Sequence, residues 1–111
     1  MKWYLERAEE KIPQRARLYA RQIGAWPEKV EIKNYKKQWG SYSHNGAIRF
    51  NWKIITAPVT ILDYVIVHEL CHLIYPNHSA QFWQKIQTTI PNYKNRRNKL
   101  KKDSLQIGIF G

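Results

Sequence analysis

The sequence predicts an α+β fold in a single small domain: a small antiparallel sheet packed with about four helices, one of them buried. Segments with apolar residues at helical spacing flank a short central segment in which apolar and polar residues alternate. The helix predicted after that segment is apolar around most of its circumference, which is typical of a buried helix. A chain of 111 residues is long enough for one hydrophobic core and too short for two domains.

The N-terminal part, residues 1–29, is predicted to be mainly helical. Apolar residues recur every three or four positions over residues 3–24, with charged residues between them. Pro13 lies inside this segment and cannot donate a backbone hydrogen bond, so a break or kink is expected near Ile12. Gly24 is expected to end the helix.

Residues 30–55 are predicted to form the small antiparallel sheet. Apolar and polar residues alternate over residues 30–36, a second strand is expected at 39–43, and a return strand at 47–52. The Asn45-Gly46 pair before the return strand favours a tight turn, because both residues tolerate positive φ values.

Three helices and a tail are predicted for the rest of the chain. Pro58 suits the start of the first helix, which is expected to run from residue 56 to about 73. Ser79 is predicted to cap a second helix that ends near residue 90. Residues 91–103 are predicted to form a very basic helix, and residues 104–111 are predicted to form an apolar, strand-like tail.

The buried helix carries an HExxH motif, His68-Glu69-Leu70-Cys71-His72. Residues four apart lie on one face of a helix, so the imidazoles of His68 and His72 can bind the same metal ion. Glu69 lies beside them, where its carboxylate can take a proton from a metal-bound water. The alternative is a pair of core histidines hydrogen-bonded to backbone carbonyls, with Glu69 paired to a basic residue.

A third metal ligand is expected, because catalytic zinc usually has three protein ligands. No Asp or Glu occurs between Leu70 and Lys102, which leaves His78, five residues after His72 and just past a proline turn. We therefore predict that the three histidines, His68, His72 and His78, bind one Zn²⁺ ion. The alternative for His78 is a surface residue at the start of a helix.

Three other polar residues are not expected to bind the metal. Asp63 faces roughly the opposite side of the buried helix and is expected to pair with a Lys or Arg. Cys71 is expected to be a small buried apolar residue. His44 lies in a predicted turn and is expected to be solvated.

Residues around the motif resemble the YgjP-like metallopeptidase family, which is related to SprT-like proteins. Besides HExxH, the resemblance rests on five segments: Trp39-Gly40-Ser41-Tyr42-Ser43, Ile48-Arg49-Phe50-Asn51-Trp52, Asn77-His78-Ser79, Phe82-Trp83, and Pro91-Asn92-Tyr93-Lys94 with Arg96-Arg97. It covers about residues 3–102. It implies a minimal zincin-like fold, a zinc ion and peptidase activity. The small size is also similar to that of minimal single-domain metallopeptidases such as selecase and proabylysin.

The predicted function is hydrolysis of peptide bonds in extended or unfolded polypeptides by a zinc-bound water that Glu69 activates. We expect the substrate to add a strand to the sheet edge above the cleft, formed by Ile48, Arg49, Phe50 and Asn51. Tyr75 and Tyr93 are candidate hydrogen-bond donors to the developing oxyanion. Packing at the rim of the cleft is the favoured alternative for both tyrosines.

The apolar tail, residues 104–111, suggests regulation. An exposed apolar strand can cover the cleft of its own chain, which would inhibit the enzyme, or pair with a second copy to form a homo-oligomer. The alternative is a tail that docks on the core without a regulatory role, or one that is disordered.

The charge balance leaves two further functions open. Nineteen Lys and Arg against eight Asp and Glu give a net charge of +11. A basic surface suits a zinc-dependent hydrolase of nucleotides or another non-peptide substrate, or a nucleic-acid-binding module with a structural metal. Nucleic acid is not the favoured partner, because a basic run such as residues 94–102 is most often a solvated helix face.

Cysteine content and hydropathy indicate the expected compartment. The single cysteine excludes an intrachain disulfide. No apolar stretch is long enough to span a bilayer, and the first residues show no signal-peptide pattern. We therefore expect a cytoplasmic protein that does not bind membranes.

Overall fold

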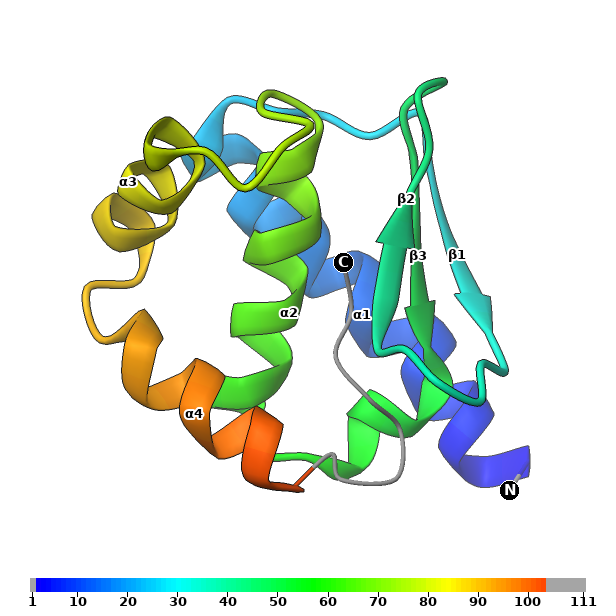
Figure 1. Ribbon diagram of the computed structural model, residues 1–111. Coiled ribbons are helices and arrows are strands. Elements are labelled where there is room, and N and C mark those ends of the chain that lie inside the picture. Colours follow the sequence, from blue (N-terminus) through cyan, green and yellow to red (C-terminus); the bar gives the residue numbers. More distant parts are fainter. Residues whose placement is uncertain (1, 104–111) are drawn as a thin grey trace.

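The computed structural model describes residues 2–103 (Figure 1). Four α-helices make up most of this part of the chain: α1 (Lys2–Ile23), α2 (Val59–His72), α3 (Ala80–Thr89) and α4 (Tyr93–Asp103). Three strands and one short 3-10 helix complete it: β1 (Lys29–Lys33), β2 (Gly40–Tyr42), β3 (Ala47–Asn51) and η1 (Trp52–Thr56). The predicted α+β class is confirmed. The apolar tail at 104–111 lies outside the described residues.

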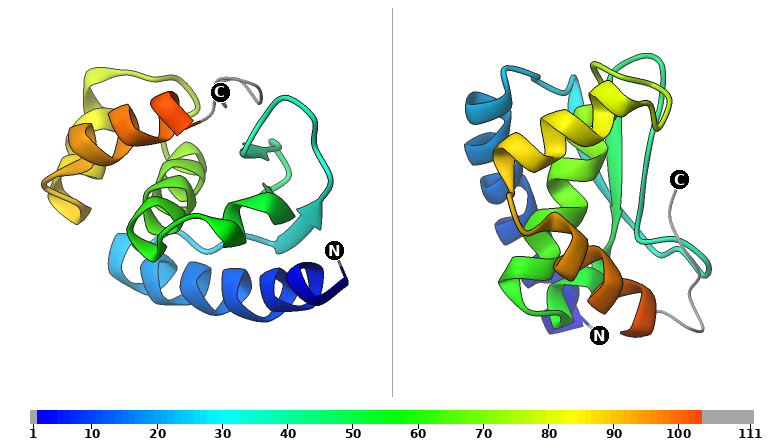
Figure 2. Two further views of the ribbon diagram at one scale, coloured as in Figure 1. Left: turned by 90° about the horizontal axis from the view of Figure 1, so that it is seen from below. Right: turned by 60° about the vertical axis from the view of Figure 1, so that its left-hand side comes forward.

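Helix α2 is the centre of the molecule. Figure 1 shows α3 and α4 on one side of it and the sheet on the other, and Figure 2 shows α1 and α4 on opposite sides of it. Every residue from Ile61 to His72 is buried, as predicted for a helix that is apolar nearly all round. Each fully buried Ile, Leu or Val side chain there contributes about 1.5–3 kcal/mol to folding. Among residues 2–103, no helix is both long enough and apolar enough to cross a bilayer.

A break or a kink was predicted near Ile12. Helix α1 continues through Pro13, so there is no break, and a kink stays a prediction. Its buried residues lie on one side of the helix both before and after the proline, and they pack against α2 and η1: Ala8, Ile12, Ala16, Ala20 and Ile23. This packing outweighs the one backbone hydrogen bond that the proline cannot make. Gly24 ends the helix as predicted, with a φ of 82° and its N–H donated to the carbonyl of Ala20.

The sheet is mixed, so the prediction of a wholly antiparallel sheet is wrong. Its strand order is β1-β3-β2, in which β2 pairs antiparallel with β3 and β1 pairs parallel with it, Val30 lying opposite Ile48. Alternating apolar residues indicate which face of a strand is buried, but they do not indicate its neighbour or its direction. Strand β3 is the most buried of the three strands and takes the middle position.

The middle position of β3 also corrects the predicted edge strand. Ile48, Arg49 and Phe50 have a partner strand on each side and cannot accept a third. Asn51 pairs with Lys33 of β1 and donates its backbone N–H to the carbonyl of Trp39. Within residues 2–103, the sheet edge nearest to α2 belongs to β2, which packs against that helix and has no second partner strand there.

Asp63 anchors α1 to the side of α2 away from the HExxH face. Its carboxylate accepts hydrogen bonds from Arg15 Nε at 2.9 Å, from Arg15 Nη2 at 2.5 Å and from the Tyr19 hydroxyl at 2.8 Å. The side chain of Asp63 is almost fully buried, so this bidentate pair satisfies a charge that would otherwise be costly. The predicted pairing of Asp63 with a basic residue is confirmed.

Replacing Asp63 with Asn is expected to lower the free energy of unfolding by about 2–3 kcal/mol, because the guanidinium loses its charged acceptor. Metal affinity should stay unchanged. Urea denaturation of the variant, beside a Glu10→Gln variant at an exposed position of α1, measures the loss. Equal midpoints for the two variants would show that the Arg15–Asp63 pair does not stabilise the helix contact.

Candidate metal centre

Three imidazoles meet at the C-terminal half of α2. His68 and His72 are buried one turn apart on the helix, and His78 is exposed in the loop before α3. The Nε2 atom of His78 lies 3.0 Å from Nε2 of His72 and 3.3 Å from Nε2 of His68. One nitrogen from each ring lies within 4.8 Å of the others. The structure thus brings together the three histidines that the sequence predicts as ligands.

Local hydrogen bonds at the end of α2 bring His78 back towards the helix. The N–H of Tyr75 donates to the carbonyl of Cys71 at 2.8 Å, and Pro76 follows, so the helix cannot continue. The Ser79 hydroxyl accepts the N–H of Phe82 in the first turn of α3, which confirms the predicted N-cap. His78 directly precedes this cap, so the start of α3 determines its position.

The spacing of the imidazoles fits a tetrahedral metal ion. Nitrogen ligands about 2.0 Å from zinc at tetrahedral angles lie about 3.3 Å apart, close to the two Nε2 separations. Nδ1 of His72 lies 3.2 Å from the backbone oxygen of Tyr75. A proton donated from Nδ1 to this carbonyl leaves the Nε2 lone pair available to a metal.

Aromatic rings hold the ligand imidazoles in place. The ring of Tyr42, from β2, stacks on His72 with centroids 4.5 Å apart, and its hydroxyl donates to the backbone oxygen of Pro76 at 2.8 Å. Phe82 also stacks on His72, at 4.6 Å, and meets His68 edge-on at 5.0 Å. The role of Tyr42 was not predicted, because no sequence signal places β2 beside α2.

Glu69 is fully buried beside this cluster. Neither of its carboxylate oxygens has a hydrogen-bond partner among the described residues, so the predicted alternative of a Glu69 ion pair is absent there. Desolvation raises the pKa of Glu69 well above the usual value. A cation held by the neighbouring imidazoles would favour the ionised carboxylate and offset the cost of its burial. The residues present therefore fit a metal ion.

Gly40 is the first residue of β2, and because it has no side chain there is room beside it for the side chain of Glu69. A Cβ atom at this position would lie 3.0 Å from Cγ of Glu69 and 3.1 Å from its Oε2, and 3.2 Å from the carbonyl oxygen of Arg49. Backbone and carboxylate approach so closely here that only glycine fits without displacing a neighbour.

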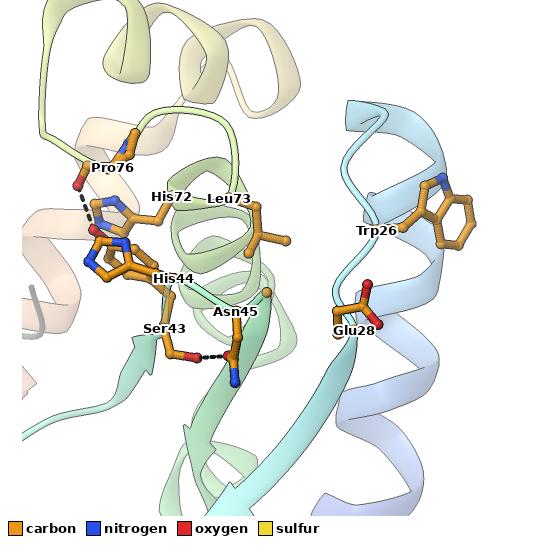
Figure 3. A pocket seen from close by; sticks show the side chains of 10 residues that line it. Trp26, Glu28, Ser43, His44, Asn45, His72, Leu73 and Pro76 are labelled. Carbon is orange, nitrogen blue, oxygen red and sulfur yellow. Dashed lines mark hydrogen bonds between the residues drawn. The ribbon is translucent and has the colours of Figure 1, made fainter.

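A pocket of about 380 Å³ adjoins His72 (Figure 3). It lies between the turn that joins β2 to β3 and the end of α2, and its lining includes His44, Leu73 and Pro76. Trp26 and Glu28 line its far side (Figure 3). His44 is exposed and outside the three-histidine cluster, as predicted.

The remaining predicted site residues lie around the cluster. Tyr75 follows α2 and contributes its backbone oxygen to His72, whereas its side chain is half-buried. Tyr93 is buried at the start of α4, where it stacks on Trp83 with centroids 5.6 Å apart. An oxyanion role for either tyrosine stays a prediction. Cys71 is buried as predicted, and burial raises the pKa of its thiol to about 12.

A family model described as the YgjP-like metallopeptidase domain matches residues 1–103. The chain belongs to the YgjP-like metallopeptidase family. Two solved metallopeptidase zymogens are similar to this YgjP-like domain in structure. Abylysin of Pyrococcus abyssi has a TM-score of 0.78 at 18% identity, covering 87% of this chain and 98% of its own. Jannalysin of Methanocaldococcus jannaschii has a TM-score of 0.69 at 20% identity, and the match covers 87% of this chain and 96% of the jannalysin chain.

At these identities the structural likeness shows a shared fold only. No curated protein sequence matches the chain. Family membership and the three-histidine cluster together show a metallopeptidase with a metal-binding site, as the resemblance in sequence implied.

Proposed function

We propose that this metallopeptidase uses zinc and Glu69 to hydrolyse peptide bonds in extended or unfolded polypeptides. The observation that carries the proposal is the buried carboxylate of Glu69, which has no hydrogen-bond partner within the described part of the chain and lies beside three converging imidazoles. Three nitrogen ligands favour zinc over magnesium or calcium, which prefer oxygen.

His68, His72 and His78 would hold the ion through Nε2. When bound, zinc polarises a substrate carbonyl and lowers the pKa of a water molecule towards about 7. The Glu69 carboxylate accepts the proton of the attacking water and then delivers it to the leaving amine. Its burial suits this role, because desolvation makes the carboxylate a stronger base than an exposed glutamate.

The polypeptide substrate would pair with β2, the corrected edge strand. Tyr42 on this strand stacks on His72, so a segment added to the free edge would pass beside the imidazoles. The pocket beside His72 would receive one of its side chains (Figure 3). Pairing through backbone groups recognises little sequence, so we expect broad specificity and a requirement for an extended segment.

The two alternative functions have less support. A nucleotide hydrolase would also need Glu69, but membership of a metallopeptidase family favours a polypeptide substrate. A nucleic-acid-binding module would not need the buried carboxylate at all.

The proposal is tested with one protein substrate in two states. A reduced and carboxymethylated protein, which is unfolded, should be cleaved by the zinc-loaded chain, whereas the same protein in its native form should resist. A chelator should stop the cleavage, and added zinc should restore it. Cleavage of neither form, by the full chain or by a chain ending at Lys102, would argue against peptidase activity.

Replacing Gly40 with Ala should lower peptide hydrolysis at least tenfold, because the new methyl group pushes against the Glu69 carboxylate. Stability should fall by about 1–3 kcal/mol through the same overpacking. Gly24→Ala is the matched control, since it strains a positive φ but would contact nothing within 4 Å. Equal activity of the two variants would show that Gly40 does not position Glu69.

We further propose that residues 104–111 limit the activity, by covering the cleft or by pairing with a second copy. Their apolar pattern supports this, as does the description of both structural relatives as zymogens. A chain ending at Lys102 should cleave faster than the full chain. Unchanged activity together with unchanged mass in solution would exclude a regulatory tail.

A further inference from the structure

Arg97 on α4 contacts Trp83, an aromatic residue that also contacts the histidine cluster. Its guanidinium carbon is 4.9 Å from the ring centre of Trp83 and 5.8 Å from that of Tyr93. The Trp83 ring centre is in turn 5.7 Å from that of His78 and 5.9 Å from that of His68. One indole therefore links the guanidinium to two of the three ligand imidazoles.

Among residues 2–102, the charge of Arg97 has no acidic partner. The side chain is half-buried, and its Nε atom is buried without a hydrogen-bond partner there. The ion pairs of the described residues involve only the carboxylates of Glu31 and Asp63. The sequence from Leu70 to Lys102, which includes α3 and most of α4, contains no Asp or Glu. A partly buried guanidinium without a counter-charge is unfavourable, so an anion supplied by a bound molecule would stabilise it.

We propose that Arg97 binds a carboxylate of the peptide substrate and thereby selects where the chain is cut. A guanidinium presents a planar set of N–H donors that matches a carboxylate with two parallel hydrogen bonds. The Trp83 and Tyr93 rings restrain the side chain, so less conformational entropy is lost when it binds. The inference rests on the proposed function, because it takes the histidine cluster as the place where a peptide is cleaved.

The position of Arg97 defines its role. Trp83 contacts both the guanidinium and the ligand rings, so the bound carboxylate belongs to a residue near the scissile bond rather than to the reacting carbonyl. Arg97 is therefore a specificity residue. A peptide offers two such carboxylates, the free C-terminus and the side chain of Asp or Glu, and both have the same recognition chemistry.

Three peptides of one neutral sequence separate these sources. The first has a free C-terminus, the second an amidated C-terminus, and the third an amidated C-terminus with one Glu. Calorimetry with the zinc-loaded Glu69→Gln chain measures binding without cleavage. The neutral amidated peptide should bind at least about tenfold more weakly than one of the other two, because it lacks the charged hydrogen-bond partner. Whichever of the two charged peptides binds more tightly identifies the source of the carboxylate, the free C-terminus or the Glu side chain.

Variants of α4 test the assignment to Arg97. Arg97→Gln should abolish the difference between the peptides, and Arg97→Lys should retain part of it because the charge remains without the planar fork. Lys101→Gln removes the same charge from an exposed position of α4 and should leave the difference intact. Zinc content and circular dichroism establish folding, and if Arg97→Gln is unfolded, Arg97→Lys decides the comparison.

The results distinguish this inference from the peptidase proposal. Equal binding of the three peptides overturns the role of Arg97, even if the native chain cleaves all of them. An equal effect of Arg97→Gln and Lys101→Gln also overturns it, because net charge alone would then explain the preference. Selective binding through Arg97 without any cleavage by the native chain supports the carboxylate site and contradicts peptidase activity.

Discussion

Replacing Glu69 with Gln is expected to lower peptide hydrolysis about a thousandfold and to leave zinc bound. The amide has nearly the same shape and fits the space beside Gly40, but it cannot accept a proton from water. Cleavage of an unfolded protein and zinc content, measured on the same preparations, test this result. Activity within tenfold of the native chain would show that another group is the general base.

The same substitution should change how the stability of the metal-free chain depends on pH. Burial raises the pKa of Glu69 in the folded chain well above its ordinary value of 4.5, which applies to the unfolded chain. The folded state therefore binds this proton more strongly, and the free energy of unfolding falls as the pH rises from about 4.5 to the folded pKa. The Gln variant has no such proton to lose. Urea denaturation of both metal-free chains between pH 4 and pH 8 should show that the free energy of unfolding falls less with rising pH in the variant than in the native chain. Parallel plots of this free energy against pH would contradict the prediction.

Replacing His72 with Phe is expected to weaken zinc binding by more than about a hundredfold. Removing a residue that only hydrogen-bonds to a metal ligand weakens metal binding by up to about a hundredfold, and loss of a ligand itself should cost more. The ring is retained, so the stack between Tyr42 and Phe82 persists while the ligand nitrogen is lost. Excess zinc stabilises the folded chain, and a hundredfold weaker affinity reduces this stabilisation by about 2.7 kcal/mol. Thermal denaturation with and without zinc measures this difference.

His44→Phe is the matched control for His72→Phe. His44 borders the same pocket but lies outside the three-histidine cluster (Figure 3). The His44→Phe variant should bind zinc as tightly as the native chain does. Equal losses in the two variants would mean that the cluster is not the metal site.

The sequence was sufficient to predict the metal cluster because its determinants are local. His68 and His72 are four residues apart on one helix, and the Pro76 turn with the Ser79 cap returns His78 to them. The burial of α2 and the ion pair of Asp63 also follow from helical periodicity, which indicates the faces of a helix.

Features that depend on contacts between distant segments could not be predicted in the same way. The middle position of β3, and hence the edge at β2, depends on strand order, which alternating residues do not encode. The proximity of Gly40 to Glu69 follows from that order. Arg97 lies in a run of basic residues that the sequence predicts as a solvated face, and only the packing of α4 on α2 places its side chain on Trp83.

The central claim is that one zinc ion, held by three histidines beside Glu69, makes this chain a peptidase. The most direct test is to add zinc stepwise to chelator-treated chain ending at Lys102 while cleavage of an unfolded protein is followed. The cleavage rate should rise in proportion to zinc and level off at one equivalent. No cleavage at any amount of zinc, or a rate that does not depend on zinc, would contradict the account.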